Sequence, residues 1–166
     1  MRPKLTRLAK IISGGQAGVD RGALDSAIAR RFPCGGWCPA GRLAEDGQIP
    51  DHYPVVEVEE GGYKQRTLRN VLDSDGTAIL YFGQIEGGTE QTLLFCIKNH
   101  KPYKLVDAEE VSAERAALLL ASFVQQYGIE RLNVAGPRQS RAPKAHAYAY
   151  TVINLLIQDL CGAEIV

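Results

Sequence analysis

Short apolar runs alternate with segments of helical periodicity along almost the whole chain. The clearest buried strand is predicted over residues 77–82, a compact apolar run that follows Asp75 and Gly76. A strongly apolar helix is predicted over residues 112–127, with Ser112 near its start and Gly128 after its end. Strands that alternate with helices of this length form parallel βαβ units with right-handed crossovers. The pattern therefore predicts an α/β fold, a single doubly wound and mostly parallel sheet with helices on both faces.

The same alternation places the other elements and leaves one long excursion between them. Further strands are expected at residues 8–12, 34–38, 55–58, 103–106 and 132–135, and further helices after Gly18, over residues 63–72, ahead of Pro102 and through residues 152–160. Residues 39–54 are rich in turn formers and poor in apolar side chains, so we expect a long loop there, a candidate lid. At roughly 150 residues per domain, the 166 residues predict one domain over residues 1–166.

The charges of the chain balance, because 19 Lys and Arg residues stand against 19 Asp and Glu residues. A protein wrapped in nucleic acid needs a surplus of Lys and Arg to neutralise phosphates. No apolar run has the length that a membrane span requires, and the charges near the first residue lack the apolar stretch of a signal peptide. We therefore expect a cytoplasmic protein that binds neither nucleic acid nor a membrane.

Three of the predicted strands end in glycine-containing loops that lead into helices. The carboxyl ends of parallel strands meet at one edge of a doubly wound sheet, where ligands bind. Glycine lets the backbone approach a ligand, and the amides and dipole of the following helix attract an anion such as phosphate. The candidate ligand-binding residues are Ser13, Gly14, Gly15, Gln16, Ala17, Gly18 and Val19 in the first loop, Gly87, Gly88 and Thr89 in the second, and Gly136, Pro137 and Arg138 in the third. The three loops together predict a site for a small phosphorylated ligand.

Two arginines are candidate partners for the anion. Arg138 stands at a predicted strand end, and its planar fork matches a phosphate or carboxylate bidentately. Arg141 and Lys144 follow it with no acid between them, either as a solvated helix start or as cations that an anionic ligand accounts for. Arg42 lies in the 39–54 excursion, where it is either a lid residue that folds over the ligand or an ordinary loop charge.

No complete catalytic or metal-binding motif accompanies these loops. The first loop has neither the lysine of a phosphate loop nor the G-x-G-x-x-G spacing of dinucleotide-binding proteins. Asp20 is either a helix cap or a ligand contact. The three histidines are widely spaced, and Cys34 and Cys38 lack the spacing of a structural zinc site. The residues therefore favour a binding protein over an enzyme, with no catalytic or metal-ligating residue assigned.

Longer motifs resemble the molybdenum cofactor carrier family over nearly the whole chain. The matching segments are residues 13–25 for the opening signature, residues 36–42, 44–47 and 49–50 for the second signature, and residues 66–67, 70–71, 74–77, 87–89 and 132–138 further on. The resemblance implies a Rossmann-like sheet, a homo-oligomer (dimer or tetramer) and a pocket for a phosphorylated heterocycle at the glycine loops. It also implies a carrier protein whose bound ligand is molybdenum cofactor (molybdopterin).

The same resemblance leaves two other functions open. The wider group includes the lysine-decarboxylase-like nucleoside-phosphate hydrolases, which carry a P-G-G-x-G-T-x-x-E motif with a catalytic glutamate. Residues 86–92 lack the proline, the second glycine step and a glutamate at that spacing. A nucleoside-monophosphate hydrolase would therefore need another base, such as Glu90 or Glu45. A nucleotide sensor of the same group would instead couple ligand binding to oligomeric state.

Overall fold

The computed structural model describes residues 7–161, in which six parallel strands form one sheet in the order β5-β2-β1-β8-β6-β7. The strands are β1 (Lys10–Ile12), β2 (Cys34–Cys38), β5 (Val55–Glu57), β6 (Gly76–Tyr81), β7 (Tyr103–Asp107) and β8 (Arg131–Ala135). From β1 the chain builds outward through β2 to β5, and then crosses to β6 on the other side of the sheet. The predicted parallel sheet is confirmed.

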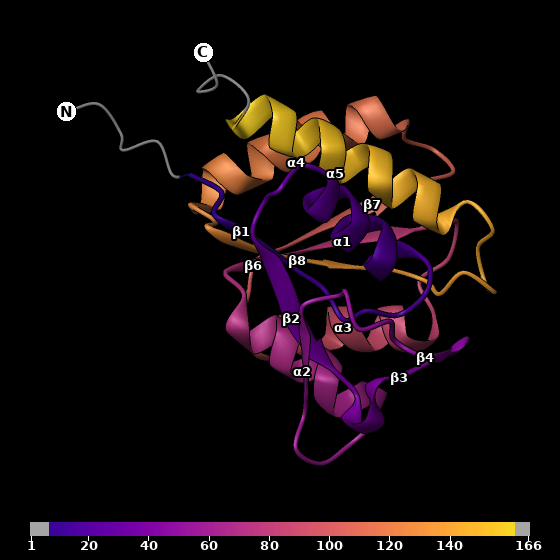
Figure 1. Ribbon diagram of the computed structural model, residues 1–166. Helices are drawn as coiled ribbons and strands as arrows, with labels where there is room; N and C mark the ends of the chain where they lie inside the picture. The colour runs from indigo at the N-terminus through magenta and orange to yellow at the C-terminus, as the bar shows by residue number, and fades with distance from the viewer. Residues whose placement is uncertain (1–6, 162–166) are drawn as a thin grey trace.

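Helices cover both faces of this sheet, as Figure 1 shows. Within residues 7–161 they are α1 (Val19–Ala29), α2 (Tyr63–Asp73), α3 (Gly87–Lys98), α4 (Ala113–Tyr127) and α5 (Ala145–Cys161). One face carries α1, α4 and α5, and the other carries α2 and α3. The predicted doubly wound arrangement is therefore confirmed. None of these helices has the length and apolar character needed to cross a membrane.

The helix α4 shows how local signals set the bounds of an element. Ser112 precedes the helix, and its side chain accepts a hydrogen bond from the backbone N–H of Arg115. Gly128 follows the last turn in the left-handed conformation, with φ of 63°. Both are standard devices for satisfying backbone groups at helix ends. The start and end that the sequence predicts for this helix are therefore correct.

The packing of α1 against α5 depends on Gly22, a small residue in the middle of the contact. A Cβ atom at this position would lie 2.4 Å from the carbonyl oxygen of His146. The main core lies between the sheet and this helical layer, with Ile11, Leu132 and Leu156 among its buried side chains. Close approach of the two helices therefore holds the loops that precede them in a fixed relation.

The position of β8 is unusual, because this last strand within residues 7–161 lies in the centre of the sheet, between β1 and β6. The end of α5 returns to the start of the chain, where Cys161 Sγ lies 3.9 Å from the carbonyl oxygen of Leu8. The neighbouring strands β8 and β6 are followed by helices on opposite faces. This divergence opens a crevice at their carboxyl ends, which is where doubly wound proteins bind ligands.

Residues 39–54 are more ordered than the long loop expected from their composition. They form the short helix η1 (Ala40–Arg42) and an antiparallel hairpin of β3 (Leu43–Ala44) with β4 (Gly47–Gln48). Ile49 and Tyr53 are buried in a second small core with Leu24 of α1. The composition did not predict this compact segment, which is held by the few buried side chains Ala44, Ile49 and Tyr53 while Leu43 stays exposed.

Candidate functional site

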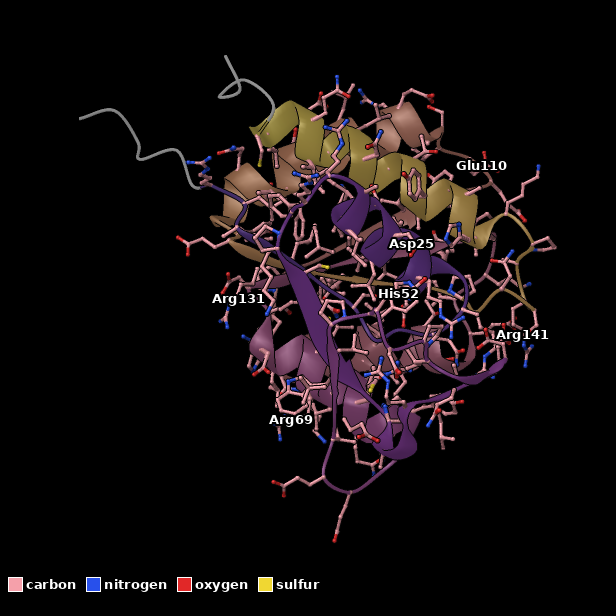
Figure 2. The ribbon with its side chains drawn as sticks, in the orientation of Figure 1. Asp25, His52, Arg69, Glu110, Arg131 and Arg141 are labelled. Atoms are coloured by element: carbon pink, nitrogen blue, oxygen red, sulfur yellow. The ribbon has the colours of Figure 1, made fainter. Side chains whose placement is uncertain are left out.

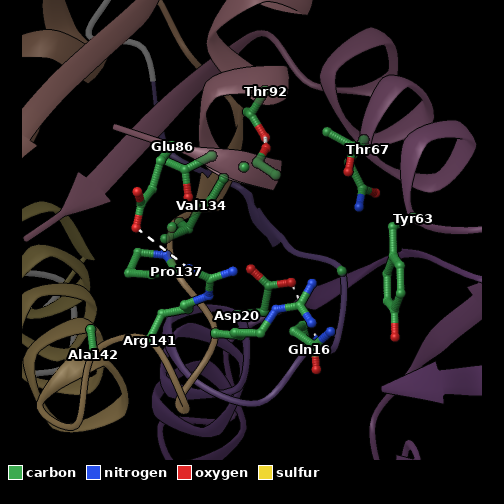
Figure 3. A pocket seen from close by; sticks show the side chains of 18 of the residues that line it. Gln16, Asp20, Tyr63, Thr67, Glu86, Thr92, Val134, Pro137, Arg141 and Ala142 are labelled. Carbon is green, nitrogen blue, oxygen red and sulfur yellow. Dashed lines mark hydrogen bonds and ion pairs between the residues drawn. The ribbon is translucent and has the colours of Figure 1, made fainter. Parts of the chain in front are cut away.

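A cavity of about 340 Å³ lies at the carboxyl ends of the central strands, and Figure 3 shows it from close by. Its volume falls in the range typical of small-molecule sites, roughly 300–1,000 Å³. Four parts of the chain contribute to its lining, and three of them contain the glycine loops. The lining residues are Gly14, Gln16 and Asp20 from the first loop and α1; Tyr63, Arg66, Thr67 and Asn70 from α2; Phe82, Gln84, Glu86, Gly87, Gly88, Thr89 and Thr92 from the segment after β6 and α3; and Asn133, Val134, Ala135, Gly136, Pro137, Arg138, Arg141 and Ala142 from β8 and the loop after it.

The first loop, between β1 and α1, is tied to the third loop by backbone hydrogen bonds. The N–H of Val19 donates to the carbonyl oxygen of Pro137 at 3.2 Å, and the N–H of Gln139 donates to that of Ala17 at 2.9 Å. Gly18 sits between them with φ of 111°, and a Cβ there would lie 2.5 Å from the carbonyl oxygen of Pro137. The amide at the start of α1 is therefore occupied by the protein itself.

Gln16 is the buried polar side chain of this loop, and only 7% of it is exposed. Its Oε1 accepts hydrogen bonds from the backbone N–H groups of Ala17 at 3.1 Å and Glu45 at 2.8 Å. Its Nε2 is buried and has no hydrogen-bond partner within residues 7–161. Because Gln16 lines the cavity, this side chain places a buried, unused donor next to the cavity.

Asp20 places a buried carboxylate beside the same loop. Its Oδ2 accepts a hydrogen bond from the backbone N–H of Gln16 at 3.3 Å and lies 3.6 Å from Nη1 of Arg66. The same Nη1 donates to the carbonyl oxygen of Gly14 at 2.8 Å. Burial raises the pKa of the Asp20 carboxyl, and the Arg66 guanidinium opposes that rise. The first loop therefore already holds a negative group, which disfavours a phosphate at this position.

The second glycine loop, at the start of α3, is exposed, unlike the buried first loop. Glu86, Gly87 and Gly88 are exposed, and nothing lies within 4 Å of a Cβ built at either glycine. The first amides of a helix have no partner within it, and Gly87 and Gly88, at the positive end of the helix dipole, both line the cavity. Thr89 is buried in the lining directly after them. This junction is suited to an anion.

Two arginines of the third loop lie at the rim of the cavity. Arg141 Nη1 lies 3.8 Å from Oε1 of Glu86, and both side chains are largely exposed. The guanidinium carbon of Arg138 lies 5.5 Å from the ring centroid of Tyr63. Figure 2 shows Arg141 on the opposite side of the molecule from Arg131, which begins β8. The cations that follow β8 therefore belong to the carboxyl edge of the sheet.

Arg42 lies outside the cavity lining, and its guanidinium is engaged elsewhere. It donates to four backbone carbonyl oxygens, those of Ile49 at 3.1 Å, Pro50 at 2.8 Å, Tyr53 at 3.2 Å and Val55 at 3.0 Å. These bonds use the cation to hold the 39–54 segment together. The sequence could not show this, because the acceptors are backbone groups. The arrangement disfavours a ligand contact for Arg42, and that role stays a prediction.

The 39–54 segment lies against the rim and contributes no residue to the cavity lining. Asp46 forms a bidentate ion pair with Arg21 of α1, with a distance of 2.8 Å between Oδ1 and Nη2. The Arg21 guanidinium lowers the pKa of the Asp46 carboxyl. The carboxylate of Glu45 accepts from the N–H and the hydroxyl of Ser140, at 3.0 and 2.6 Å. In this structure the candidate lid is a docked support that joins the first and third loops.

The predicted site residues divide into cavity lining and supporting backbone. The lining includes Gly14, Gln16, Gly87, Gly88, Thr89, Gly136, Pro137 and Arg138, whereas Ser13, Gly15, Ala17, Gly18 and Val19 lie behind it. The hydroxyl of Ser13, for example, donates a hydrogen bond to the carbonyl oxygen of Val134 at 2.7 Å. Their roles in ligand binding stay predictions.

The helix α2 is the part of the site that sequence reasoning missed as a whole. Tyr63, Arg66 and Asn70 line the cavity, although α2 follows none of the three glycine loops. Arg66 and Asn70 stood within the segments that resemble the carrier family, and both are buried in spite of their polarity. These two polar residues within a family-like segment were the one sign in the sequence that α2 belongs to the site. Only the crossover from β5 to β6 shows that α2 borders the crevice.

The comparisons with known proteins agree with this architecture. The circularly permutated YpsA SLOG family matches residues 11–157. The chain is similar to the "putative molybdenum carrier protein" of Syntrophus aciditrophicus, with 41% sequence identity and a TM-score of 0.89 over 93% of this chain and 98% of that one. No curated protein matches the chain.

A parallel sheet with a cavity at the carboxyl ends of its central strands defines a Rossmann-like α/β protein. Within that class, the chain belongs to the circularly permutated YpsA SLOG family. The central place of β8, the last strand in the described part of the chain, agrees with a permuted strand order. The expected resemblance to molybdenum carrier proteins is also confirmed.

Proposed function

We propose that this protein is a carrier that binds a small phosphorylated heterocycle in the cavity, with molybdenum cofactor (molybdopterin) as its ligand. The observation that carries the proposal is the start of α3, where exposed amides meet a cavity bordered by Arg138 and Arg141. The similar protein from Syntrophus aciditrophicus supports the choice of ligand through its name as a molybdenum carrier.

The phosphate of the ligand is best accommodated at the start of α3. The helix dipole and the amides of Gly87 and Gly88 favour an anion there, and Arg138 adds a bidentate donor from the third loop. At the first loop an anion would meet the Asp20 carboxylate and an amide that Pro137 already occupies. The proposal therefore assigns the phosphate to the start of α3 and leaves the first loop for the heterocycle.

The heterocycle would lie against α2 and the end of β6. Tyr63 and Phe82 offer aromatic surface, and Asn133 offers a polar group for orientation, whereas the Asn70 amide already binds the backbone of Trp37. The carboxylates considered for a hydrolase are elsewhere, because Glu45 binds Ser140 and Glu90 is exposed outside the lining. This placement supports binding without turnover over nucleoside-monophosphate hydrolysis.

Calorimetric titration of the purified protein with molybdenum cofactor under anaerobic conditions, and with AMP and GMP, tests the proposal. We expect saturable binding of the cofactor and no release of free base from either nucleotide. Tight nucleotide binding without cofactor binding would contradict the carrier function, and base release would indicate a hydrolase. Light scattering of the same samples separates a carrier from a sensor, because a sensor changes its oligomeric state when ligand is added.

A further inference from the structure

Two buried polar groups of the cavity are not used by the proposed phosphate site. Gln16 is 7% exposed and Asp20 is 9% exposed, and both line the cavity. Figure 3 shows the two side chains beside each other at the first loop. Burying a donor without a partner costs stability, so a cavity that keeps one is suited to a ligand that accepts from it.

The orientation of the Gln16 amide is fixed by its neighbours. Oε1 accepts from two backbone N–H groups, those of Ala17 and Glu45. Turning the amide over would bring its NH₂ group against these two donors. Glu45 is itself held by Ser140 through two hydrogen bonds. Nε2 therefore remains a buried donor with no partner within residues 7–161, and a ligand acceptor would satisfy it.

The Asp20 carboxylate supplies the complementary acceptor. Its Oδ2 accepts the backbone N–H of Gln16 at 3.3 Å, and the backbone N–H of Gly14 and the Ser13 hydroxyl are further donors close to the carboxylate. The nearby Arg66 nitrogen at 3.6 Å already donates to the carbonyl oxygen of Gly14. A carboxylate has about four acceptor positions, and the Ser13 hydroxyl donates to the carbonyl oxygen of Val134, so about two positions remain for ligand N–H groups. Burial raises the pKa of this carboxyl, and the positive charge of Arg66 opposes that rise in favour of the ionised form.

A donor beside a carboxylate matches one edge of a heterocycle particularly well. A 2-amino-4-oxo pyrimidine edge, as in pterins and guanine, presents an oxygen acceptor followed by a ring N–H and an amino group. We infer that Gln16 donates to the oxo group and that Asp20 accepts from the ring N–H and the amino group. The pair would then select 2-amino-4-oxo heterocycles, an inference that rests on the proposed binding function.

Two competing uses of Asp20 predict other ligand preferences. A phosphate at this place would face a like charge and would not require the Gln16 donor. Two sugar hydroxyls could donate to Asp20, but they would make binding depend on the sugar and not on the amino group of the base. Ligands that differ in a single group can therefore separate the three cases.

The test is calorimetric titration of the wild-type protein with two matched ligand pairs. GMP and IMP differ in the 2-amino group, and so do 6-hydroxymethylpterin phosphate and the corresponding 2-deamino compound. We expect the amino ligand of at least one pair to bind about tenfold more tightly, a difference of about 1.4 kcal/mol. The ligand dGMP should bind like GMP if Asp20 does not bind the sugar.

Substitutions then assign the preference to the pair. Asp20→Asn replaces one acceptor by a donor and should bring the affinity ratio within each pair close to one. Gln16→Glu keeps an oxygen for the two backbone donors but removes Nε2, so it should weaken both members of a pair about tenfold. Lys144→Ala, a third-loop cation outside the lining, should change neither quantity.

The outcomes are distinguishable. Equal affinities within both pairs overturn the inference, while the binding function stands. If GMP and IMP bind equally and dGMP binds more weakly than GMP, Asp20 binds the sugar. No binding of any of these ligands or of the cofactor overturns the proposed function as well. The wild-type series decides the matter even if a variant fails to fold.

Discussion

Two strand-to-helix junctions at the same edge of the sheet have similar glycine-rich sequences. They differ in whether their backbone amides are available to a ligand. The junction before α1, here the closed junction, is buried, and its groups are taken by Pro137, by the Gln16 side chain and by Asp20. The junction before α3, here the open junction, is exposed, with its first amides open to the cavity. A glycine-rich junction is therefore an anion site only where the rest of the fold leaves its amides unused.

The largest expected effect is a loss of stability when a glycine of the closed junction is replaced, which the same replacement in the open junction should not cause. Gly18→Ala forces a Cβ to within 2.5 Å of the carbonyl oxygen of Pro137 at a φ of 111°. We expect a loss of about 3 kcal/mol or more, and a fall in Tm of roughly 6–12 °C. Thermal unfolding followed by circular dichroism measures this.

Gly88→Ala is the matched control for that substitution. A Cβ at Gly88 meets nothing within 4 Å, and the backbone is not in the left-handed region. Alanine is also the better helix former, so the free energy of unfolding should change by less than about 1 kcal/mol. Equal losses at the two glycines would mean that the junctions do not differ as described.

The next effect concerns affinity at the open junction. Arg138→Ala should weaken binding of the phosphorylated ligand by about 1.5–3 kcal/mol, because a bidentate charged hydrogen bond is lost. Calorimetry with the cofactor measures the change, and Lys144→Ala serves as control because Lys144 lies outside the lining. An unchanged dissociation constant for Arg138→Ala would place the phosphate elsewhere.

The contrast between the junctions also explains how far sequence reasoning could go. The fold followed from local signals, such as the apolar run of β6 and the caps at Ser112 and Gly128. The state of the closed junction depends on Pro137, which lies more than a hundred positions away in the chain. The contribution of α2 likewise depends on strand order. Such contacts are set by tertiary packing, and no local pattern reports them.

A smaller effect tests whether the closed junction holds a costly charge. Because burial raises the pKa of Asp20 in the folded state, the ionised carboxylate destabilises the fold above that pKa, and the penalty disappears as pH falls toward the unfolded value of 3.8. We expect Asp20→Asn to raise Tm at pH 7.5 by a few degrees, since about 1 kcal/mol corresponds to roughly 2–4 °C. The gain should shrink on acidification.

Asp46→Asn provides a control of opposite sign for this pH dependence. Arg21 lowers the pKa of Asp46, so the charged form stabilises the fold above the unfolded pKa and this contribution is lost on acidification. The Asp46 side chain is 49% exposed, which limits the effect through solvent screening. A lower Tm for Asp20→Asn at pH 7.5 would show that the Arg66 contact outweighs the burial of Asp20.

The smallest expected effect concerns the acid at the open junction. Glu86 precedes α3 and lies 3.8 Å from Arg141, so its carboxylate competes with a ligand phosphate for that arginine. Glu86→Gln removes the charge and keeps the shape of the side chain. We expect the phosphorylated ligand to bind about two- to fivefold more tightly at low salt, with the gain reduced by added salt because both groups are exposed.

Calorimetry at two salt concentrations measures this change in affinity. The control is Glu90→Gln, at an exposed acid of α3 outside the lining, which should have a weaker effect. If Glu86→Gln weakened binding instead, the carboxylate would be a positioning group for Arg141.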